Sequence, residues 1–328
     1  MKLAIIGITG MVGREMLEVL NERNFFITEL IPVASKKSKG KLISFKNKQY
    51  KIISMSDLLE KDVDLALFSA GSNISKIWAP KLSAKGCKVI DNSSYWRMSN
   101  AHKLIVPEIN GNSLSKDDMI ISNPNCSTVQ LVMALAPLHK KLIVKRVIVS
   151  TYQAVSGTGK KAIDQLESEA KQLSSNLVYP HNIYNNILPH CDDFTDNGYT
   201  KEEMKLSAET KKILDNNIEV VATAVRVPVI RCHSESVNVT FQNDFILEDV
   251  KSYIDNMIGV TVIDNPQKNK YPMPINCKNK DEVFVGRIRR DFTYENSLNM
   301  WIVSDNLRKG AATNTVQIAE YLLENNLF

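Results

Sequence analysis

The stretch Lys2-Leu3-Ala4-Ile5-Ile6-Gly7-Ile8-Thr9-Gly10-Met11-Val12-Gly13 opens the chain and decides its fold. A short apolar run is followed by three glycines in the spacing G-x-x-G-x-x-G, and an amphipathic pattern starts directly after them. This order is typical of a strand, a tight turn and a helix whose N-terminus holds the pyrophosphate of a dinucleotide. The predicted cofactor contacts of this loop are Gly7, Thr9, Gly10, Met11, Val12 and Gly13. The alternative is a glycine turn that only lets the strand and the helix pack together.

Four more apolar runs continue the pattern, and helical stretches such as 74–85 separate them. The runs predict strands over residues 27–34, 65–69, 88–91 and 119–122. Alternating strands and helices predict an α/β fold with a doubly wound, Rossmann-like parallel sheet, whose ligand lies at the carboxyl ends of the strands. Ser69 and Gly71 follow one of these ends and are predicted cofactor contacts.

The residues after the second strand indicate which dinucleotide binds. An NAD site usually has Asp or Glu there, to hold the ribose 2′-hydroxyl. This chain has Ser35-Lys36-Lys37-Ser38 instead. Hydroxyl and ammonium groups bind a 2′-phosphate, whereas a carboxylate repels it. The sequence therefore favours NADP, with Ser35, Lys36 and Ser38 as contacts; a solvated basic loop is the alternative.

Composition limits the remaining possibilities. The chain has 328 residues, enough for two domains, and its net charge of +5 comes from 41 Lys+Arg against 36 Asp+Glu. This small excess gives no support for nucleic acid as a partner and suits an anionic ligand. No apolar stretch approaches the ~18 residues of a membrane span. The five scattered cysteines lack metal-ligand spacing, so we expect no metal and a reduced, cytoplasmic protein.

The segment Ile120-Ile121-Ser122-Asn123-Pro124-Asn125-Cys126-Ser127-Thr128 carries the chemistry. A strand ends at Ser122, Asn and Pro make a turn, and a helical pattern begins near Ser127. Cys126 is thus predicted at a helix N-terminus, where the dipole and the open amide groups stabilise a thiolate and an oxyanion. A lone cysteine is more often a small buried hydrophobic residue. The position of Cys126 at the end of a strand, beside the cofactor crevice, favours a nucleophile.

These motifs, together with the later Arg231-Cys232-His233-Ser234 and Asn306-Leu307-Arg308-Lys309-Gly310-Ala311-Ala312, resemble the aspartate-semialdehyde dehydrogenase family along almost the whole chain. The resemblance implies NADPH-dependent reduction of L-aspartyl 4-phosphate to L-aspartate 4-semialdehyde and phosphate, through a thioester on the cysteine. In such enzymes this step serves the biosynthesis of lysine, threonine, methionine and diaminopimelate. It also implies a homodimer, with no membrane partner.

The resemblance further assigns site residues in the second half of the chain. It implies that Cys126, Gln153 and His233 are catalytic, that Arg97, Asn125, Glu202, Lys205 and Arg226 bind substrate, and that Ser156, Gly157 and Asn306 lie at the nicotinamide. Residues three apart share a helix face, so Glu202 and Lys205 can point into one pocket; a charged, solvated helix start is the alternative. Residues 224–234 read as a strand-like segment that leads to His233, whose reference pKa near ~6.5 suits proton exchange near neutral pH.

We expect an NADP-binding domain over residues 1–125, completed by a C-terminal helix within 307–328, and an α+β catalytic and dimerisation domain over residues 126–306. Two rival functions remain. N-acetyl-gamma-glutamyl-phosphate reductase would use the same cysteine and histidine, but its acetylated substrate offers Glu202 no positive charge. A non-catalytic NADP-binding regulator would need neither Cys126 nor His233.

Overall fold

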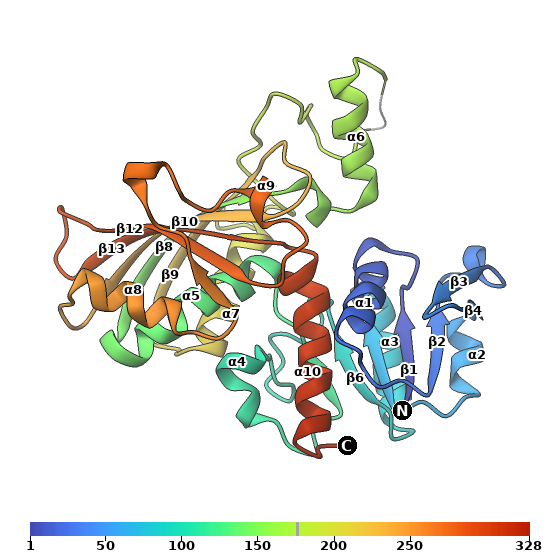
Figure 1. Ribbon diagram of the computed structural model, residues 1–328. Coiled ribbons are helices and arrows are strands. Elements are labelled where there is room, and N and C mark those ends of the chain that lie inside the picture. The colour runs from blue at the N-terminus through green and yellow to red at the C-terminus, as the bar shows by residue number, and fades with distance from the viewer. Residues whose placement is uncertain (175–176) are drawn as a thin grey trace. The chain divides into compact units, whose positions relative to one another are not determined.

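A computed structural model of the protein describes residues 1–174 and 177–328 (Figure 1). These residues form two compact units. The first unit combines residues 1–125 with residues 311–328, and the second spans residues 126–310.

The first unit is built on a parallel sheet with the strand order β2-β1-β5-β6-β7. Its strands are β1 (Lys2–Ile6), β2 (Glu29–Val33), β5 (Leu65–Phe68), β6 (Lys88–Asp91) and β7 (Ile120–Ser122). All four residues of β5 are buried, as expected for a parallel strand that is covered on both faces. The doubly wound, Rossmann-like sheet predicted from the sequence is confirmed.

Helices cover both faces of this sheet. On one face Leu3 and Ile5 pack in a cluster with apolar residues of α1 (Met11–Glu22) and α10 (Thr313–Glu324). On the other face Ala4 and Ile6 pack with residues of two further helices. The remaining elements of the unit are α2 (Met55–Leu59), α3 (Ser72–Ser83), α4 (Pro107–Asn110), the short turns η1 (Lys36–Ser38) and η2 (Gly111–Ser113), and the hairpin of β3 (Leu42–Phe45) and β4 (Lys48–Lys51). Alternate residues of β1 thus serve two separate cores, which is why its apolar run is continuous.

The second unit contains a mixed sheet with the strand order β11-β12-β13-β10-β8-β9. Its strands are β8 (Val144–Gln153), β9 (Glu219–Arg226), β10 (His233–Phe241), β11 (Val260–Val262), β12 (Val283–Arg290) and β13 (Ser297–Ser304). The β8–β9 and β11–β12 pairs are parallel, and the other three pairs are antiparallel.

Helix α5 (Cys126–Leu142) packs on this sheet and is buried around most of its circumference from Ser127 to Leu135. Its near-continuous apolar sequence matches that position, since a helix that is hydrophobic on all sides belongs in a core. The other elements of the unit are α6 (Lys160–Ala170), α7 (Lys201–Ile213), α8 (Leu247–Asp255), α9 (Pro274–Cys277), and the turns η3 (Val155–Gly157) and η4 (Pro266–Lys268); a π-helical turn, η5 (Arg308–Ala312), ends the unit and leads into α10.

Strand β8 ends at Gln153, which places that residue on the sheet. One sequence prediction differs from the structure in detail. The strand-like segment 224–234 is two strands, because β9 ends at Arg226 and β10 begins at His233. Cys232 has a φ of 76°, a left-handed conformation that is rare in strands, and it lies in the irregular segment between β9 and β10. Within the described ranges, no helix has both the length and the apolar character needed to cross a membrane.

Candidate active site

The predicted cofactor loop joins β1 to α1 in the first unit. Gly7 has a φ of 89°, and a Cβ at this position would lie 2.4 Å from the carbonyl oxygen of Ser69, so only glycine fits. Ser69 follows β5, the parallel neighbour of β1, and its N–H donates to the carbonyl of Ile6 at 2.8 Å. The two turns predicted to contact the cofactor, one carrying Gly7 and the other Ser69 and Gly71, therefore lie side by side.

Helix α1 starts in a way that suits an anion. Its N-cap is Gly10, which has no side chain to accept a hydrogen bond from the first-turn amide groups, and that turn has no acidic residue. A phosphate placed there meets N–H groups and the positive end of the helix dipole. Thr9, Met11, Val12 and Gly13 belong to the same turn and first helical turn.

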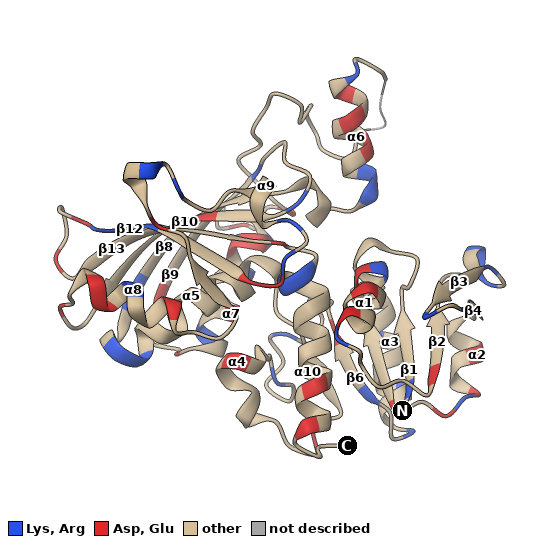
Figure 2. Cartoon of the chain, viewed as in Figure 1, with Lys and Arg blue, Asp and Glu red and all other residues tan. Residues whose placement is uncertain are grey.

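The basic residues after β2 form the short turn η1. Ser35 and Lys36 are exposed, and Ser38 is half-buried. Lys39 instead forms an ion pair with Asp57, at 2.7 Å. Figure 2 shows that Lys and Arg are otherwise scattered along both units among acidic residues, so this turn is a local cluster rather than part of a basic face.

Two predicted substrate residues belong to the first unit. Arg97 is buried, and its Nη2 donates to the carbonyl of Asn92 at 2.7 Å. Asn125 is buried and is the last residue before α5. A buried guanidinium retains its charge, so the environment of Arg97 suits an anionic group.

Cys126 is the first residue of α5, as predicted, and differs from the other four cysteines. It is partly exposed, whereas Cys87, Cys191, Cys232 and Cys277 are buried. Burial raises the pKa of Cys87 and Cys191 to about 12 and that of Cys277 to about 11, and it also raises the pKa of Cys232. Cys126 is thus the accessible thiol of the chain, at the end of a helix that favours a thiolate.

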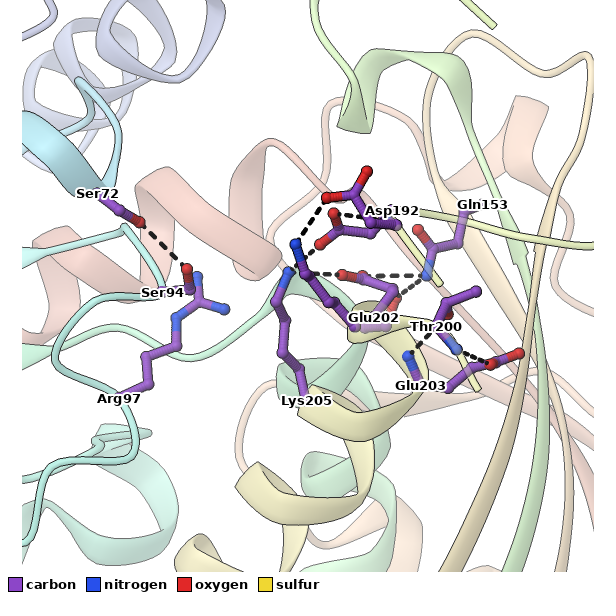
Figure 3. A network of polar contacts seen from close by, with 12 residues as sticks. Ser72, Ser94, Arg97, Gln153, Asp192, Thr200, Glu202, Glu203 and Lys205 are labelled. Carbon is purple, nitrogen blue, oxygen red and sulfur yellow. Dashed lines mark hydrogen bonds and ion pairs between the residues drawn. The ribbon is translucent and has the colours of Figure 1, made fainter. Parts of the chain in front are cut away.

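Gln153 links the start of α5 to α7. Its Nε2 donates to Ser127 Oγ at 3.1 Å, to Thr151 Oγ1 at 3.2 Å and to Glu202 Oε1 at 3.3 Å (Figure 3). Ser127 directly follows Cys126, so these contacts place Gln153 near the start of α5, where Cys126 lies.

Glu202 and Lys205 lie on one face of α7, with Oε2 and Nζ 3.5 Å apart. Lys205 also pairs with Asp192 at 2.5 Å, a partner that the sequence did not reveal because Asp192 lies in the irregular segment before the helix. A capping box formed by Thr200 and Glu203 fixes the helix start. The result is a charged cluster held by a rigid helix end rather than a freely solvated one (Figure 3).

His233 is fully buried at the start of β10, and its ring is held by the backbone. The N–H of Ala154 donates to His233 Nδ1 at 3.0 Å, and Arg226 Nη1 donates to the carbonyl of the same alanine at 2.7 Å. Because Nδ1 accepts a hydrogen bond, the proton of the neutral ring is on Nε2. Within the described residues, His233 Nε2 and Arg226 Nε have no hydrogen-bond partner. Two polar atoms are therefore available to a ligand.

Burial, and then the charge of Arg226, lower the pKa of His233 well below its usual range. The burial of this ring, which the sequence did not reveal, therefore favours its neutral form near neutral pH. His233 is a neutral imidazole that carries a proton on Nε2, and it enters a reaction as a hydrogen-bond or proton donor.

Ser156 and Asn306, predicted to lie at the nicotinamide, contact each other. Asn306 Nδ2 donates to Ser156 Oγ at 2.9 Å, and Asn306 Oδ1 accepts from the N–H of Cys232 at 3.0 Å. Gly157 lies so close to the imidazole that a Cβ on it would be 3.3 Å from His233 Nε2. All these residues belong to the second unit, so one unit combines the nucleophile, the histidine and the acidic, amide and basic side chains.

Sequence reasoning missed one buried carboxyl. Glu235 on β10 is fully buried, its register partner on β8 is Thr151, and burial raises its pKa well above the usual range, although the Gln130 side chain of α5 favours the charged form. A Glu within the run His233-Ser234-Glu235-Ser236 reads as an ordinary polar residue of a strand. Among the described side chains, no group of three or more His, Cys, Asp and Glu is arranged to hold a metal ion.

Comparison with known proteins shows the family of the chain. Residues 2–117 match the family model described as semialdehyde dehydrogenase, NAD binding domain, and residues 135–309 match semialdehyde dehydrogenase, dimerisation domain. The aspartate-semialdehyde dehydrogenase of Aquifex aeolicus (strain VF5) is 51% identical over 99% of both chains. That of Bacillus subtilis (strain 168) is 44% identical over 99% of this chain and 98% of the relative.

A solved structure agrees in fold as well. Aspartate semialdehyde dehydrogenase II from Vibrio cholerae, complexed with ASA, is 40% identical, covers 98% of each chain and superposes with a TM-score of 0.94. The agreement covers both units, their sheets and the segment that carries Cys126. The chain therefore belongs to the aspartate-semialdehyde dehydrogenase family.

Proposed function

We propose that the chain catalyses the NADPH-dependent reductive dephosphorylation of L-aspartyl 4-phosphate to L-aspartate 4-semialdehyde and phosphate. One observation carries this proposal: an accessible thiol at the start of α5 shares a unit with a buried, backbone-held histidine whose Nε2 has no hydrogen-bond partner among the described residues. Nearly full-length relatives of that name support the substrate. In a cell this step would supply the biosynthesis of lysine, threonine, methionine and diaminopimelate, and five cysteines that form no disulfide suit the reducing cytoplasm.

The charges of the site match the charges of the substrate. Glu202 is the partner for the α-amino group, and Arg226 is the partner for the α-carboxylate, because its planar guanidinium binds a carboxylate with two hydrogen bonds. Lys205 and Arg97 are the partners for the phosphate. Asn125 and Gln153 orient the acyl group beside Cys126.

In the first step the Cys126 thiolate attacks the acyl carbon, and the carbon–oxygen bond to phosphate breaks with its electron pair leaving on phosphate. A thioester on Cys126 remains, which divides one difficult displacement into two easier steps. The amide groups at the start of α5 stabilise the negative oxygen that forms. Bound NADPH supplies the hydride that reduces the thioester.

His233 acts in the second step. Its Nε2–H donates to the oxygen of the reacting carbon as negative charge develops there, and the proton returns to the ring as the aldehyde forms and the thiolate leaves. A neutral ring can perform this task because its proton is already on the nitrogen that faces the ligand. Protonation to imidazolium is not required.

The first unit supplies the cofactor site. The turn Gly7, Thr9, Gly10, Met11, Val12 and Gly13 receives the pyrophosphate, the residues Ser35, Lys36 and Ser38 receive the 2′-phosphate, and Ser69 and Gly71 line the same crevice. The open first-turn amide groups of α1 and the absence of a carboxylate at η1 support NADP over NAD. Gly157 is the contact in the second unit that we place against the nicotinamide.

A homodimer completes the proposal. One face of the mixed sheet in the second unit exposes alternate residues of β8 and β9, among them Ile148, at 37% exposure, and Thr223. We place a second copy of the chain on this face, consistent with the dimerisation domain that matches here. Sedimentation of wild type as a dimer and of Ile148→Asp as a monomer is the expected result, and a monomeric wild type contradicts it.

Two other functions are less well supported. N-acetylglutamyl phosphate has an uncharged amide nitrogen, which cannot form an ion pair with a carboxylate. Glu202, which accepts a hydrogen bond from Gln153, would therefore have no cationic partner on that substrate. A non-catalytic NADP-binding regulator would have no use for an accessible thiol beside a backbone-held histidine.

The test is phosphate-dependent reduction of NADP by aspartate semialdehyde, followed by absorbance at the reduced-cofactor band, with N-acetylglutamate semialdehyde as the rival substrate. Turnover of aspartate semialdehyde by wild type, and no turnover by Cys126→Ala, is the expected result. Preference for the acetylated substrate would support the rival reductase. A folded wild type that binds NADP and turns over neither substrate would support the regulator.

A further inference from the structure

A closed set of hydrogen bonds surrounds the histidine of the second unit. It joins three segments that are far apart in the sequence: residues 154–157, residues 232–233 and Asn306. Ala154 N–H donates to His233 Nδ1 at 3.0 Å, Cys232 N–H donates to Asn306 Oδ1 at 3.0 Å, and Asn306 Nδ2 donates to Ser156 Oγ at 2.9 Å. Asn306, Ser156, Cys232 and His233 are all buried, so water does not compete for these bonds.

Cys232 is the residue whose backbone these hydrogen bonds restrain. Its φ of 76° is a conformation that favours glycine, and it is the residue that turns the chain into β10, one position before His233. A non-glycine residue stays in this region only when its surroundings hold it there. The hydrogen bond from its N–H to Asn306 Oδ1 is such a restraint.

Asn306 is itself rigidly placed. Its neighbour Asp305 is fully buried and accepts hydrogen bonds from the N–H groups of Asn279, at 2.7 Å, and of Leu307, at 3.0 Å. Arg231, on the other side of Cys232, pairs with the same carboxylate at 2.9 Å. Adjacent residues 305 and 306 thus hold adjacent residues 231 and 232.

The side chain of Asn306 joins two segments. Its oxygen accepts from Cys232 and its nitrogen donates one of its two hydrogens to Ser156, so the second hydrogen can still serve the nicotinamide contact expected from the sequence. Ser156 lies two residues after Ala154. The backbone of Ala154 makes hydrogen bonds with both His233 and Arg226. Asn306 therefore connects the two segments that define the position of the imidazole.

We propose that Asn306 is a positioning residue for His233: by tying Cys232 to Ser156, it holds the imidazole with Nδ1 on the Ala154 amide and Nε2–H toward the reacting atoms. This role rests on the proposed reaction but not on the identity of its substrate. Geometry at Nε2 matters in the reduction step, whereas we assign most of the binding of NADP to the turns of the first unit and most of the binding of substrate to Glu202, Lys205 and Arg226. Loss of this role should therefore lower kcat and leave KM nearly unchanged.

The test compares Asn306→Leu, which removes both hydrogen bonds at similar volume, with Ser156→Ala, which removes one. Positioning contacts of this kind are worth ~10–100-fold in activity. We expect kcat to fall by about 100-fold in Asn306→Leu and by about 10-fold in Ser156→Ala, with each KM within about threefold of wild type. A rise in KM for NADP of about 10-fold with unchanged kcat overturns the proposal and assigns Asn306 to the cofactor.

A second measurement does not depend on turnover. In protein with 15N-labelled histidine, the ring correlations of His233 in wild type should show a protonated Nε2 and an unprotonated Nδ1. In folded Asn306→Leu, as judged by its melting curve, we expect a mixture of ring states. If His233 keeps the wild-type pattern in that variant, the positioning role is wrong. An inactive wild type contradicts the proposed function alone, and the ring correlations still decide the role of Asn306.

Discussion

Gly310 packs directly against Cys126: a Cβ built on Gly310 would lie 2.7 Å from Cβ of Cys126 and 3.1 Å from its Cα. The two residues are the ends of the second unit in the sequence, yet the π-helical turn η5 brings them into contact. The atoms that would be struck belong to the first residue of α5, so no flexible side chain can move aside. Glycine at 310 thus sets the position of the thiol.

Gly310→Ala should therefore displace Cys126 and reduce catalysis. A shift of a few tenths of an ångström to 1 Å in a reacting group costs up to ~100-fold in rate, and overpacking costs ~1–3 kcal/mol of stability. We expect kcat to fall by about 10–100-fold, with a modest fall in Tm. Steady-state kinetics, a melting curve and the rate of Cys126 labelling by a thiol reagent measure these effects. Wild-type kinetics in Gly310→Ala would show that the start of α5 adjusts to the added methyl group without loss of catalysis.

Lys205 is expected to bind the phosphate, and Lys201 on the same helix is its matched control. Lys201 pairs with Asp193 at 2.7 Å and is more exposed than Lys205. A hydrogen bond to a charged group is worth ~1.5–3 kcal/mol, which is about 10–100-fold in affinity. Lys205→Met should raise KM for phosphate in the oxidative direction by at least about 10-fold, and Lys201→Met should leave it within about twofold. Equal effects of the two substitutions would assign the loss to the general charge of α7.

The 2′-phosphate prediction rests on the turn η1. Lys36→Glu replaces an attractive charge by a repulsive one, so kcat/KM for NADP should fall by about 10-fold while kcat/KM for NAD changes little. Lys48→Glu on β4, another exposed lysine of the same unit, is the control for a change of net charge. An equal fall in kcat/KM for NADP and for NAD in Lys36→Glu would mean that the turn does not bind the 2′-phosphate.

Glu235 gives a pH dependence of stability with a definite sign. Burial raises the pKa of its carboxyl in the folded state, whereas in the unfolded chain the group ionises near pH 4.3. Folding therefore requires a proton at Glu235 above that pH. Its favourable contribution is complete below the unfolded pKa and is lost as pH rises toward the folded pKa.

Glu235→Gln removes this requirement, because an amide does not titrate. The Tm of Glu235→Gln should therefore rise relative to the Tm of wild type between about pH 5 and pH 8. Each pH unit changes the difference in their free energies of unfolding by at most ~1.4 kcal/mol. Melting curves of the two proteins in matched buffers measure the shift. A constant difference across this range would mean that Glu235 ionises in the folded protein.

The sequence allowed the fold to be predicted because its signals were local. The apolar run of β1, the glycines after it and the basic turn after β2 each occupy a few consecutive residues, and the parallel sheet follows from their repetition. The position of Cys126 could be predicted for the same reason, since the turn at Pro124 and the helical pattern after Ser127 place it at a helix start.

The contacts that define the chemistry of the site could not be predicted, because they join distant segments. The tautomer of His233 depends on the backbone N–H of Ala154, 79 positions away, and its low pKa depends on burial and on Arg226. The pairing of Lys205 with Asp192 depends on an irregular segment that no periodicity describes. The left-handed backbone conformation of Cys232 could not be predicted either, since no residue in Arg231-Cys232-His233 favours a positive φ.

The thioester on Cys126 is the point on which the proposed mechanism depends. Wild type mixed with aspartate semialdehyde and NADP, without phosphate, should release a burst of NADPH equal to the number of active sites. Mass spectrometry should then find one aspartyl group on the peptide that contains Cys126, and added phosphate should remove it. A burst with no adduct, or an adduct on another residue, would contradict covalent catalysis at Cys126.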